Sequence, residues 1–124
     1  MLTETTSKLK IDIDKRTYTF ALNIVLFVQK LSKNFVCNEL GRQLLKSGTS
    51  IAANIEEAQG AFSKDDFIFK MNTALKEAKE THLWLKLIRD SKVSDDIDNL
   101  TGLIEESYQI KKILGKIVKT SKGI

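Results

Sequence analysis

The sequence predicts an all-α protein in which residues 1–124 form a single domain, an antiparallel up-down-up-down four-helix bundle with left-handed packing. Three observations carry this prediction. The chain contains no proline, the commonest helix breaker. Its apolar residues recur alternately at every third and fourth position, which places them on one seam of a helix. Four such segments are separated by short breaks, and helices with short connections must alternate in direction.

The composition is that of a folded globular protein, with 42% hydrophobic and 29% charged residues. The single cysteine, Cys37, cannot form an internal disulfide, and the sequence shows neither a signal-peptide pattern nor an apolar run of membrane length. We therefore expect a cytoplasmic protein. The net charge of +4 is compatible with an acidic partner such as nucleic acid, although the distribution of charge matters more than its total.

The first part of the chain predicts an arm followed by a helix. Residues 1–13 carry no helical stripe and end in an alternation of Leu9, Ile11 and Ile13, so we expect an irregular N-terminal arm. The first helix is expected at about residues 14–35, with two apolar rows. The rows comprise Tyr18, Ala21, Val25 and Val28, and Phe20, Ile24, Phe27, Leu31 and Phe35. Their combined width predicts a second contact, with the arm or with another subunit.

Three further helices follow, at about residues 38–60, 63–91 and 94–121. Asn38, Ser63 and Ser94 are the expected N-caps, because their side chains can accept a hydrogen bond from an unpaired amide of the first turn. Gly60 and Gly123 are expected to end the second and fourth helices.

The seams of these helices differ in polarity. The third helix places Phe67, Met71, Ala74, Ala78, Thr81, Leu85 and Ile88 on its seam. The second places Leu40, Leu44, Ser47, Ile51, Asn54 and Ala58 there, so a hydroxyl and an amide occupy positions that normally hold carbon. The fourth is expected to bury Ile97, Leu100, Ile104, Ser107, Ile110, Leu114 and Ile117. Gly48, in the middle of the second helix, predicts a close helix approach or a local bend.

Two polar rows face each other across the predicted hairpin of the second and third helices. They consist of Ser50, Asn54 and Glu57, and of Glu77 and Glu80. We expect a structural polar cluster, in which Ser50 and Asn54 donate hydrogen bonds to a carboxylate and so fix helix register or a subunit contact. The alternative is a ligand site, which a cavity lined by these groups and holding a ligand or metal would indicate.

The sequence offers no catalytic, cofactor or metal site within one subunit. His82 is the only histidine, and Lys79 stands where a Glu-x-x-His metal repeat requires a carboxylate. Cys37 has no base adjacent in sequence, and the six glycines do not cluster into a phosphate loop. We expect His82 at the surface or in an interface. An enzymatic interpretation needs a site shared between subunits, around Glu57, Glu77, Glu80 and His82.

Self-association is predicted from the aromatic residues. Trp84 lies off the core seam of the third helix, on the side of Glu77 and Glu80, and tryptophan is enriched in interfaces. Together with the two rows of the first helix, this predicts a homo-oligomer with Phe20, Phe27 and Trp84 at its interface.

One end of the predicted bundle is basic. The up-down-up-down arrangement gathers Lys8, Lys10, Lys15, Arg16, Lys64, Lys70, Lys112, Lys116, Lys119 and Lys122 there, and Asp12, Asp14, Glu56, Glu57, Asp65 and Asp66 dilute their charge without cancelling it. Two interpretations stay open: the lysines complement helix dipoles, or they bind a polyanion. For the second, the candidate nucleic-acid contacts are Lys15, Arg16, Lys112, Lys116 and Lys119.

The run from Gln43 to Ile88 resembles the signature of a bacterial four-helix-bundle family first named for proteins encoded in intervening sequences of 23S ribosomal RNA genes. The residues that carry the resemblance are Gln43, Ser50, Asn54, Glu57, Ser63, Asp66, Phe67, Glu77, Glu80 and Trp84. Glu57-Ala58 departs from the Glu-Gly of many members. The resemblance implies an antiparallel four-helix bundle that assembles as a ring, commonly a pentamer, without established catalytic activity. A related bundle is the accessory protein of diversity-generating retroelements, which engages a reverse transcriptase and its RNA.

Two functions remain in view from the sequence. The first is a non-enzymatic, ring-forming adaptor whose basic end contacts RNA or a nucleic-acid enzyme such as a reverse transcriptase. A ring would multiply a weak basic patch into avid binding. The second is a purely structural or protein-binding scaffold, for which charge reversal at the lysines leaves partner binding intact.

Overall fold

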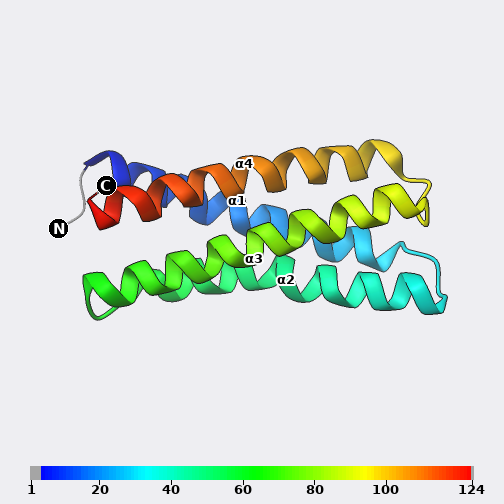
Figure 1. Cartoon of the computed structure of the whole chain (residues 1–124), viewed down its shortest axis with the longest axis horizontal. Coiled ribbons are helices and arrows are strands. Elements are labelled where there is room, and N and C mark those ends of the chain that lie inside the picture. The colour runs from blue at the N-terminus through cyan, green and yellow to red at the C-terminus, as the bar shows by residue number, and fades with distance from the viewer. Residues whose placement is uncertain (1–3, 124) are drawn as a thin grey trace.

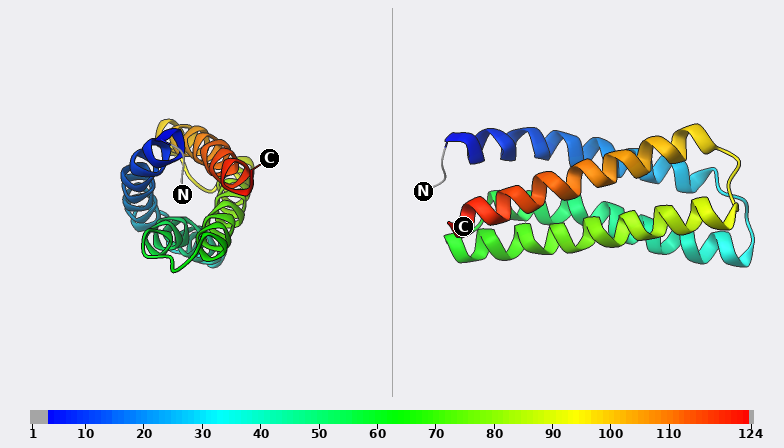
Figure 2. Two further views of the ribbon diagram at one scale, coloured as in Figure 1. Left: turned by 90° about the vertical axis from the view of Figure 1, so that its left-hand side faces the viewer. Right: turned by 45° about the horizontal axis from the view of Figure 1, so that its top comes forward.

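The chain forms four long helices, as seen in a computed structural model that describes the backbone of residues 4–123 and the side chains of residues 13–123. The helices are α1 (Glu4–Gln29), α2 (Phe35–Gln59), α3 (Lys64–Ser91) and α4 (Ile97–Lys122). Successive helices run in opposite directions, and the view along the bundle shows them surrounding a common axis (Figures 1 and 2). Each helix packs against its two neighbours, α1 against α2 and α4, and α3 against α2 and α4. The predicted up-down-up-down four-helix bundle is therefore confirmed.

The core follows the predicted seams closely in α3. All seven seam residues of α3, from Phe67 to Ile88, are buried. In α2, Leu44, Ser47, Ile51 and Ala58 are buried as expected. Ile55 is also buried, while its neighbour Asn54 is only partly covered, so the buried stripe of α2 turns toward α1 near its end.

The row predicted for α4 is partly wrong. Ile97 is exposed and Ile104 is half-buried at the edge of the core, whereas Leu103 is buried. Leu100, Leu103, Ser107 and Ile110 keep the alternation of three and four residues, and that alternation puts Leu103 on the seam and Ile104 beside it. Both leucine and isoleucine are apolar, so the sequence alone left the choice between adjacent positions open.

Both ends of α3 and the C-terminal ends of α2 and α4 lie where the sequence predicted them. Ser63 is the N-cap of α3, and its Oγ accepts a hydrogen bond from the Asp66 amide at 3.1 Å. The Asp66 carboxylate in turn accepts from the amide of Phe62 at 3.3 Å. Gly60 is the C-cap of α2. Gly123 is the C-cap of α4 with φ of 81°, a left-handed conformation that favours glycine.

Two predicted N-caps are wrong. Asn34, and not Asn38, caps α2: Asn34 is extended, and its Oδ1 accepts a hydrogen bond from the Cys37 amide at 2.9 Å. The first connection therefore lies before Phe35, and α1 ends at Gln29 instead of residue 35. Ser94 precedes α4 by a turn and accepts from the Asp96 amide at 3.2 Å. Both errors arose because an asparagine or serine near a break is an equally good cap at several positions.

The irregular arm predicted for residues 1–13 is also wrong over residues 4–13, which belong to α1. Residues 1–3 lie outside the described part of the chain. The spacing of Ile13, Thr17, Phe20 and Ile24 continues the seam of α1 backwards, and both Ile13 and Thr17 are buried. Ile13, the last residue of the alternation that suggested an extended arm, is thus part of the helical seam.

Glycines bring α1 and α2 into close contact. A Cβ atom added at Gly48 would lie 3.1 Å from Ile24 Cγ2, and one added at Gly41 would lie 3.2 Å from Leu31 Cδ1. The close approach predicted at Gly48 is confirmed. In the described part of the chain no helix combines the length and the apolar character needed to cross a membrane.

Candidate nucleic-acid interface

The second half of α4 carries a concentrated positive charge. From Ser107 to Gly123 the sequence contains no aspartate or glutamate and five lysines. We call these lysines the α4 basic face; they are Lys111, Lys112, Lys116, Lys119 and Lys122. Lys111 is half-buried and the other four are exposed. The face lies toward the end of the bundle where both chain termini are found (Figure 1).

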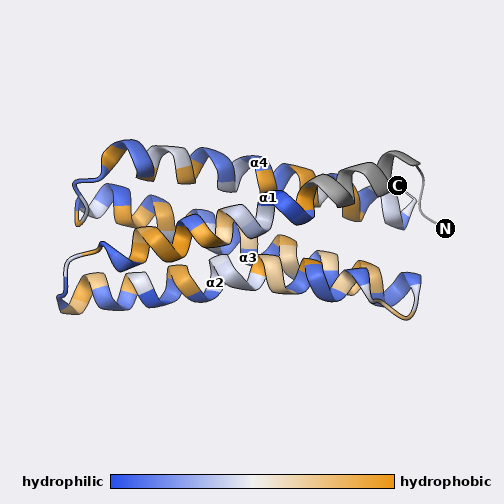
Figure 3. Ribbon diagram, turned by 180° about the vertical axis from the view of Figure 1, so that it is seen from behind, coloured by the Kyte–Doolittle hydropathy of each residue, from blue (hydrophilic) through white to orange (hydrophobic). Residues whose placement is uncertain are grey.

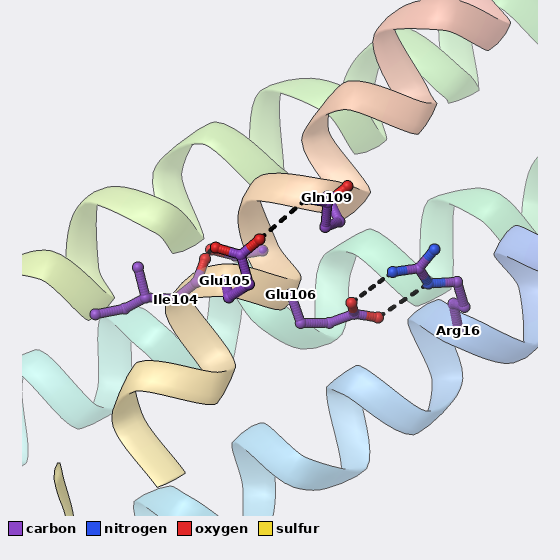
Figure 4. Close-up of polar contacts among 6 residues, drawn as sticks. Arg16, Ile104, Glu105, Glu106 and Gln109 are labelled. Atoms are coloured by element: carbon purple, nitrogen blue, oxygen red, sulfur yellow. Dashed lines mark hydrogen bonds and ion pairs between the residues drawn. The ribbon is translucent and has the colours of Figure 1, made fainter. Parts of the chain in front are cut away.

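Arg16 does not extend this face as the sequence suggested. Its guanidinium donates two hydrogen bonds to Glu106 of α4, from Nε to Oε2 at 3.0 Å and from Nη2 to Oε1 at 2.6 Å (Figure 4). The two side chains are 39% and 33% exposed, so the ion pair lies at the edge of the α1–α4 contact. Because the fork of the guanidinium is used by Glu106, Arg16 ties α1 to α4 instead of offering a free cation to phosphate.

Lys15 remains exposed beside this ion pair. Together with Arg16, Asn23 and Glu106 it lines a shallow groove of about 230 Å³ between α1 and α4. Of the five candidate contacts, Lys15, Lys112, Lys116 and Lys119 are therefore exposed cations, and Arg16 is engaged within the bundle.

An aromatic residue that the sequence analysis did not single out lies beside the α4 basic face. Tyr108 is 42% exposed, and the ammonium groups of Lys111 and Lys112 lie over its ring, 5.2 and 5.4 Å from the centroid. The sequence does contain a signal for this cluster. The two lysines stand three and four residues after the tyrosine, and side chains at that spacing share one helix face.

His82 of α3 completes this cluster. Its ring lies 6.1 Å from that of Tyr108, and its Nδ1 lies 2.8 Å from Ser107 Oγ. The Ser107 hydroxyl also donates a hydrogen bond to the carbonyl oxygen of Ile104 at 2.8 Å. The imidazole then donates from Nδ1. Burial lowers the pKa of His82 below its ordinary value, and the nearby charges of Lys111 and Lys86 lower it further. His82 is thus half-buried at the α3–α4 contact, partly covered where the sequence suggested a surface or interface position.

The predicted polar cluster does not form across α2 and α3. Ser50 Oγ donates to the carbonyl of Lys46 at 2.7 Å, and Asn54 Nδ2 donates to the carbonyl of Ser50 at 2.8 Å, so both bond within their own helix. Glu57 forms an ion pair with Lys70 at 2.9 Å. The expected donation of Ser50 and Asn54 to a carboxylate is therefore wrong, because helix carbonyls one turn earlier are nearer acceptors.

Glu77 and Glu80 instead line a polar pocket between α2 and α3. The pocket has a volume of about 210 Å³ and is bordered also by Gln43, Lys46, Ser47, Lys76 and Trp84. Partial burial raises the pKa of Glu77, and the nearby carboxylate of Glu80 raises it further, while Lys76 and Lys46 oppose the shift. Trp84 packs at the edge of the core on the side of α3 predicted for it.

Besides the Glu57–Lys70 ion pair, a buried polar contact crosses between α2 and α3 and joins Ser47 and Thr81. Their hydroxyl oxygens lie 2.9 Å apart, and both residues are buried. Thr81 Oγ1 is also 2.8 Å from the carbonyl oxygen of Glu77, and Ser47 Oγ is 3.3 Å from that of Leu44. The core therefore supplies an acceptor for each hydroxyl proton.

Phe20 and Phe27 are not available to another subunit. Each is 1% exposed inside a single chain, so their assignment to an oligomer interface is wrong. Of the two predicted rows of α1, the phenylalanine row is the core seam. The outer surface carries Tyr18 together with Leu22 and Leu26, which belong to neither predicted row; these three are 68%, 46% and 44% exposed. Figure 3 shows how strongly hydrophobic residues dominate the second half of α1.

The residues named for a shared enzymatic site point apart. His82 contacts α4, whereas Glu77 lines the pocket toward α2 and Glu57 pairs with Lys70. Cys37 is buried, with its Sγ 3.8 Å from the carbonyl oxygen of Val93. Among the described side chains, no group of three or more histidines, cysteines and carboxylates is arranged to hold a metal ion.

Comparison with known proteins connects this bundle with a family. A family model described as 23S rRNA-intervening sequence protein matches residues 9–116. A solved structure of a protein with unknown function from the S23 ribosomal protein family of Bacteroides thetaiotaomicron VPI-5482 is 37% identical, with a TM-score of 0.80. The match covers 90% of this chain and 98% of that protein. No curated protein matches the chain. The extent of the family match, on a chain with this fold and this structural relative, shows that the protein belongs to the family of 23S rRNA-intervening sequence proteins.

Proposed function

We propose that the protein is a non-enzymatic adaptor that binds RNA through the α4 basic face. The observation that carries this proposal is the separation of charge along α4. Its carboxylates, Asp98, Glu105 and Glu106, all lie in the first half of the helix. The charged residues of the second half are all lysines. A helix surface whose charged residues are all lysines attracts a polyanion, because binding releases the counterions condensed on its phosphates.

Dipole complementation accounts for only part of this charge. The favourable effect of a cation on a helix C-terminus falls off within the last turn. Lys119 and Lys122 lie in that turn, but Lys111 and Lys112 lie more than a turn before it. The name of the structural relative, which refers to a ribosomal protein family, supports RNA as the polyanion.

Self-association is part of the same proposal. The outer row of α1, formed by Tyr18, Leu22 and Leu26, supports a contact between copies. The family resemblance implies that such copies form a ring, commonly of five subunits. Replacing both leucines with serine (L22S with L26S) is expected to reduce the mass of the intact assembly to that of a monomer while the helical content stays unchanged. An unchanged assembly mass would remove α1 from the contact.

Charge reversal tests RNA binding directly. The variant Lys112→Glu, Lys116→Glu, Lys119→Glu is expected to weaken binding of a labelled RNA oligonucleotide by about ten-fold or more at low salt. The matched control, Lys30→Glu, Lys33→Glu, Lys92→Glu, changes the net charge equally at the opposite end of the bundle and is expected to stay within about two-fold of wild type.

The outcomes of this experiment distinguish an interface on α4 from a general effect of net charge and from a protein-binding function. Equal losses in both variants would show a response to net charge alone and would contradict an interface on α4. Absence of RNA binding by the wild-type protein would favour the alternative function, a protein-binding scaffold whose partner ignores these lysines.

A further inference from the structure

The cluster around Tyr108 has properties that phosphate binding alone does not require. The ring is 42% exposed, and its hydroxyl makes no hydrogen bond to the described residues. A tyrosine held only for structural reasons normally buries its ring and pairs its hydroxyl. Here the ring is partly exposed, and the ammonium groups of Lys111 and Lys112 lie near it, 5.2 and 5.4 Å from its centroid.

We propose that Tyr108 is a stacking platform for an unpaired base of single-stranded RNA, with Lys111 and Lys112 placed to bind the adjoining phosphates. This inference rests on the proposed RNA-binding function and specifies the form of RNA. Proteins that bind single strands combine a cationic track with aromatic side chains on which bases stack, and the π-face of every base makes such stacking tolerant of sequence.

The surroundings of the ring support a fixed platform. His82 lies beside Tyr108 and is itself held by the 2.8 Å contact of its Nδ1 with Ser107 Oγ. Positive charge reaches the cluster from both helices, from Lys86 and Arg89 on α3 as well as from α4. Two carboxylates precede Tyr108 closely on α4, and both are engaged: Glu105 accepts a hydrogen bond from Gln109 at 3.0 Å, and Glu106 pairs with Arg16.

A-form duplexes give such a ring little to contact, because their bases are stacked on one another inside the helix. A duplex would still bind the lysines through its phosphates. A stacking role for Tyr108 therefore predicts a selective loss of single-strand binding when the ring is removed, whereas a purely electrostatic role predicts equal losses for both forms of RNA.

Phe35 provides a matched control. Its ring is also exposed, at 85%, but it lies at the start of α2, at the end of the bundle opposite the last turn of α4. Phe35→Ala thus removes an exposed aromatic ring from the same protein without touching the α4 basic face or the outer row of α1.

The experiment compares a single-stranded RNA oligonucleotide with an RNA duplex of equal length on the full chain. Tyr108→Ala is expected to weaken single-strand binding by about ten-fold and to leave duplex binding within about two-fold of wild type. Tyr108→Phe keeps the ring and should bind both forms as wild type does. Phe35→Ala should also match wild type, and circular dichroism checks that each variant is helical.

Three results would overturn the stacking role. They are single-strand binding by Tyr108→Ala as tight as by wild type, an equal loss for duplex and single strand, and a loss in Tyr108→Phe as large as in Tyr108→Ala. In each of these cases wild-type RNA binding that depends on Lys112, Lys116 and Lys119 would leave the proposed function standing. If wild type binds neither form of RNA, both proposals fail together, and tight binding of a poly-glutamate probe would then identify an acidic protein segment as the partner.

Discussion

Ser47 and Thr81 place two hydroxyl groups where the seams of α2 and α3 would otherwise hold carbon. Burying a hydroxyl is unfavourable unless it is hydrogen-bonded, and here each has an acceptor within the core. The pair also favours one register of α2 along α3, because a shift by one turn would separate the two oxygens and leave each hydroxyl bonded only within its own helix.

A double-mutant cycle measures this coupling. Thr81→Val and Ser47→Ala are each expected to lower the free energy of unfolding by about 1 kcal/mol. The double variant should lose less than the sum of the two, by about 0.5 to 1 kcal/mol, because either single change already removes the hydrogen bond between the two hydroxyls. Urea unfolding at a fixed protein concentration gives all three values. Strictly additive losses would show that the hydroxyls do not interact.

His82 reports on the electrostatic field of the α4 basic face. Its pKa is lowered from 6.5, first by burial and then by Lys111 and Lys86, while the carbonyl of Ile104 opposes the shift. In the unfolded chain the histidine regains its ordinary pKa and takes up a proton first as the pH falls. The stability of the folded state should therefore decrease as the pH falls below about 6.5 and level off below the folded-state pKa.

Lys111→Ala should raise the pKa of His82 toward 6.5, because it removes the largest charge contribution to the shift. The chain has one histidine, so its imidazole proton signal in an NMR titration needs no assignment. A wild-type pKa at or above 6.5 would contradict the burial and charges described for this residue, and an unchanged value in the variant would remove Lys111 as a cause.

At the scale of the elements, the α1–α2 contact depends on a glycine. Gly48 is buried, and an added Cβ would lie 3.1 and 3.2 Å from Cγ2 and Cγ1 of Ile24. Ile24 is fully buried and β-branched, so it cannot move aside through a rotamer change. Gly115 in α4 offers a contrast, since nothing lies within 4 Å of a Cβ added there.

Gly48→Ala and Gly115→Ala should therefore have opposite effects. Alanine at position 115 should raise the free energy of unfolding by about 0.5 to 1 kcal/mol through better helix propensity. Alanine at position 48 gains the same propensity but overpacks the contact with Ile24, with an expected net loss of about 1 kcal/mol. Thermal unfolding followed by circular dichroism measures both. A rise in stability for Gly48→Ala would mean that α1 and α2 can separate without cost.

The bundle could be predicted from the sequence because its helices obey one period over many residues. The seam of α3 repeats for seven positions, and Ser63 with Gly60 marks a boundary from both sides. Where a second apolar residue stood beside the seam, as with Leu103 and Ile104, the period did not decide between neighbours. The rows of α1 failed for the same reason, since both were apolar and only packing distinguished core from surface.

The candidate site was less predictable than the fold. The lysines of α4 were found from their place in the chain, but the pairing of Arg16 with Glu106 joins residues on different helices and depends on three-dimensional register. The polar rows of α2 and α3 show the same limit. Their spacing correctly placed Ser50 and Asn54 on one face of α2. Both side chains nevertheless donate their hydrogen bonds to backbone carbonyls of α2 and not to a carboxylate of α3.

At the scale of the whole molecule, charge is distributed unequally over the faces of the bundle. The α1–α2 side carries a pocket lined by Asp14 and Glu56, and the α3–α4 side carries the α4 basic face with Tyr108 and His82. A modest net charge of +4 thus conceals a surface that is locally much more positive. An RNA interface on α4 requires this surface to contact phosphates, while the rest of the bundle keeps α4 in its position.

The salt dependence of RNA binding tests that requirement most directly. For a single strand, the logarithm of the affinity should fall with the logarithm of the salt concentration, with a slope of about −0.7 for each phosphate neutralised. Replacing Lys112, Lys116 and Lys119 with alanine should then reduce the steepness of the wild-type slope by about 2. A wild-type affinity that is indifferent to salt, or an equal slope in the variant, would contradict an RNA interface on α4.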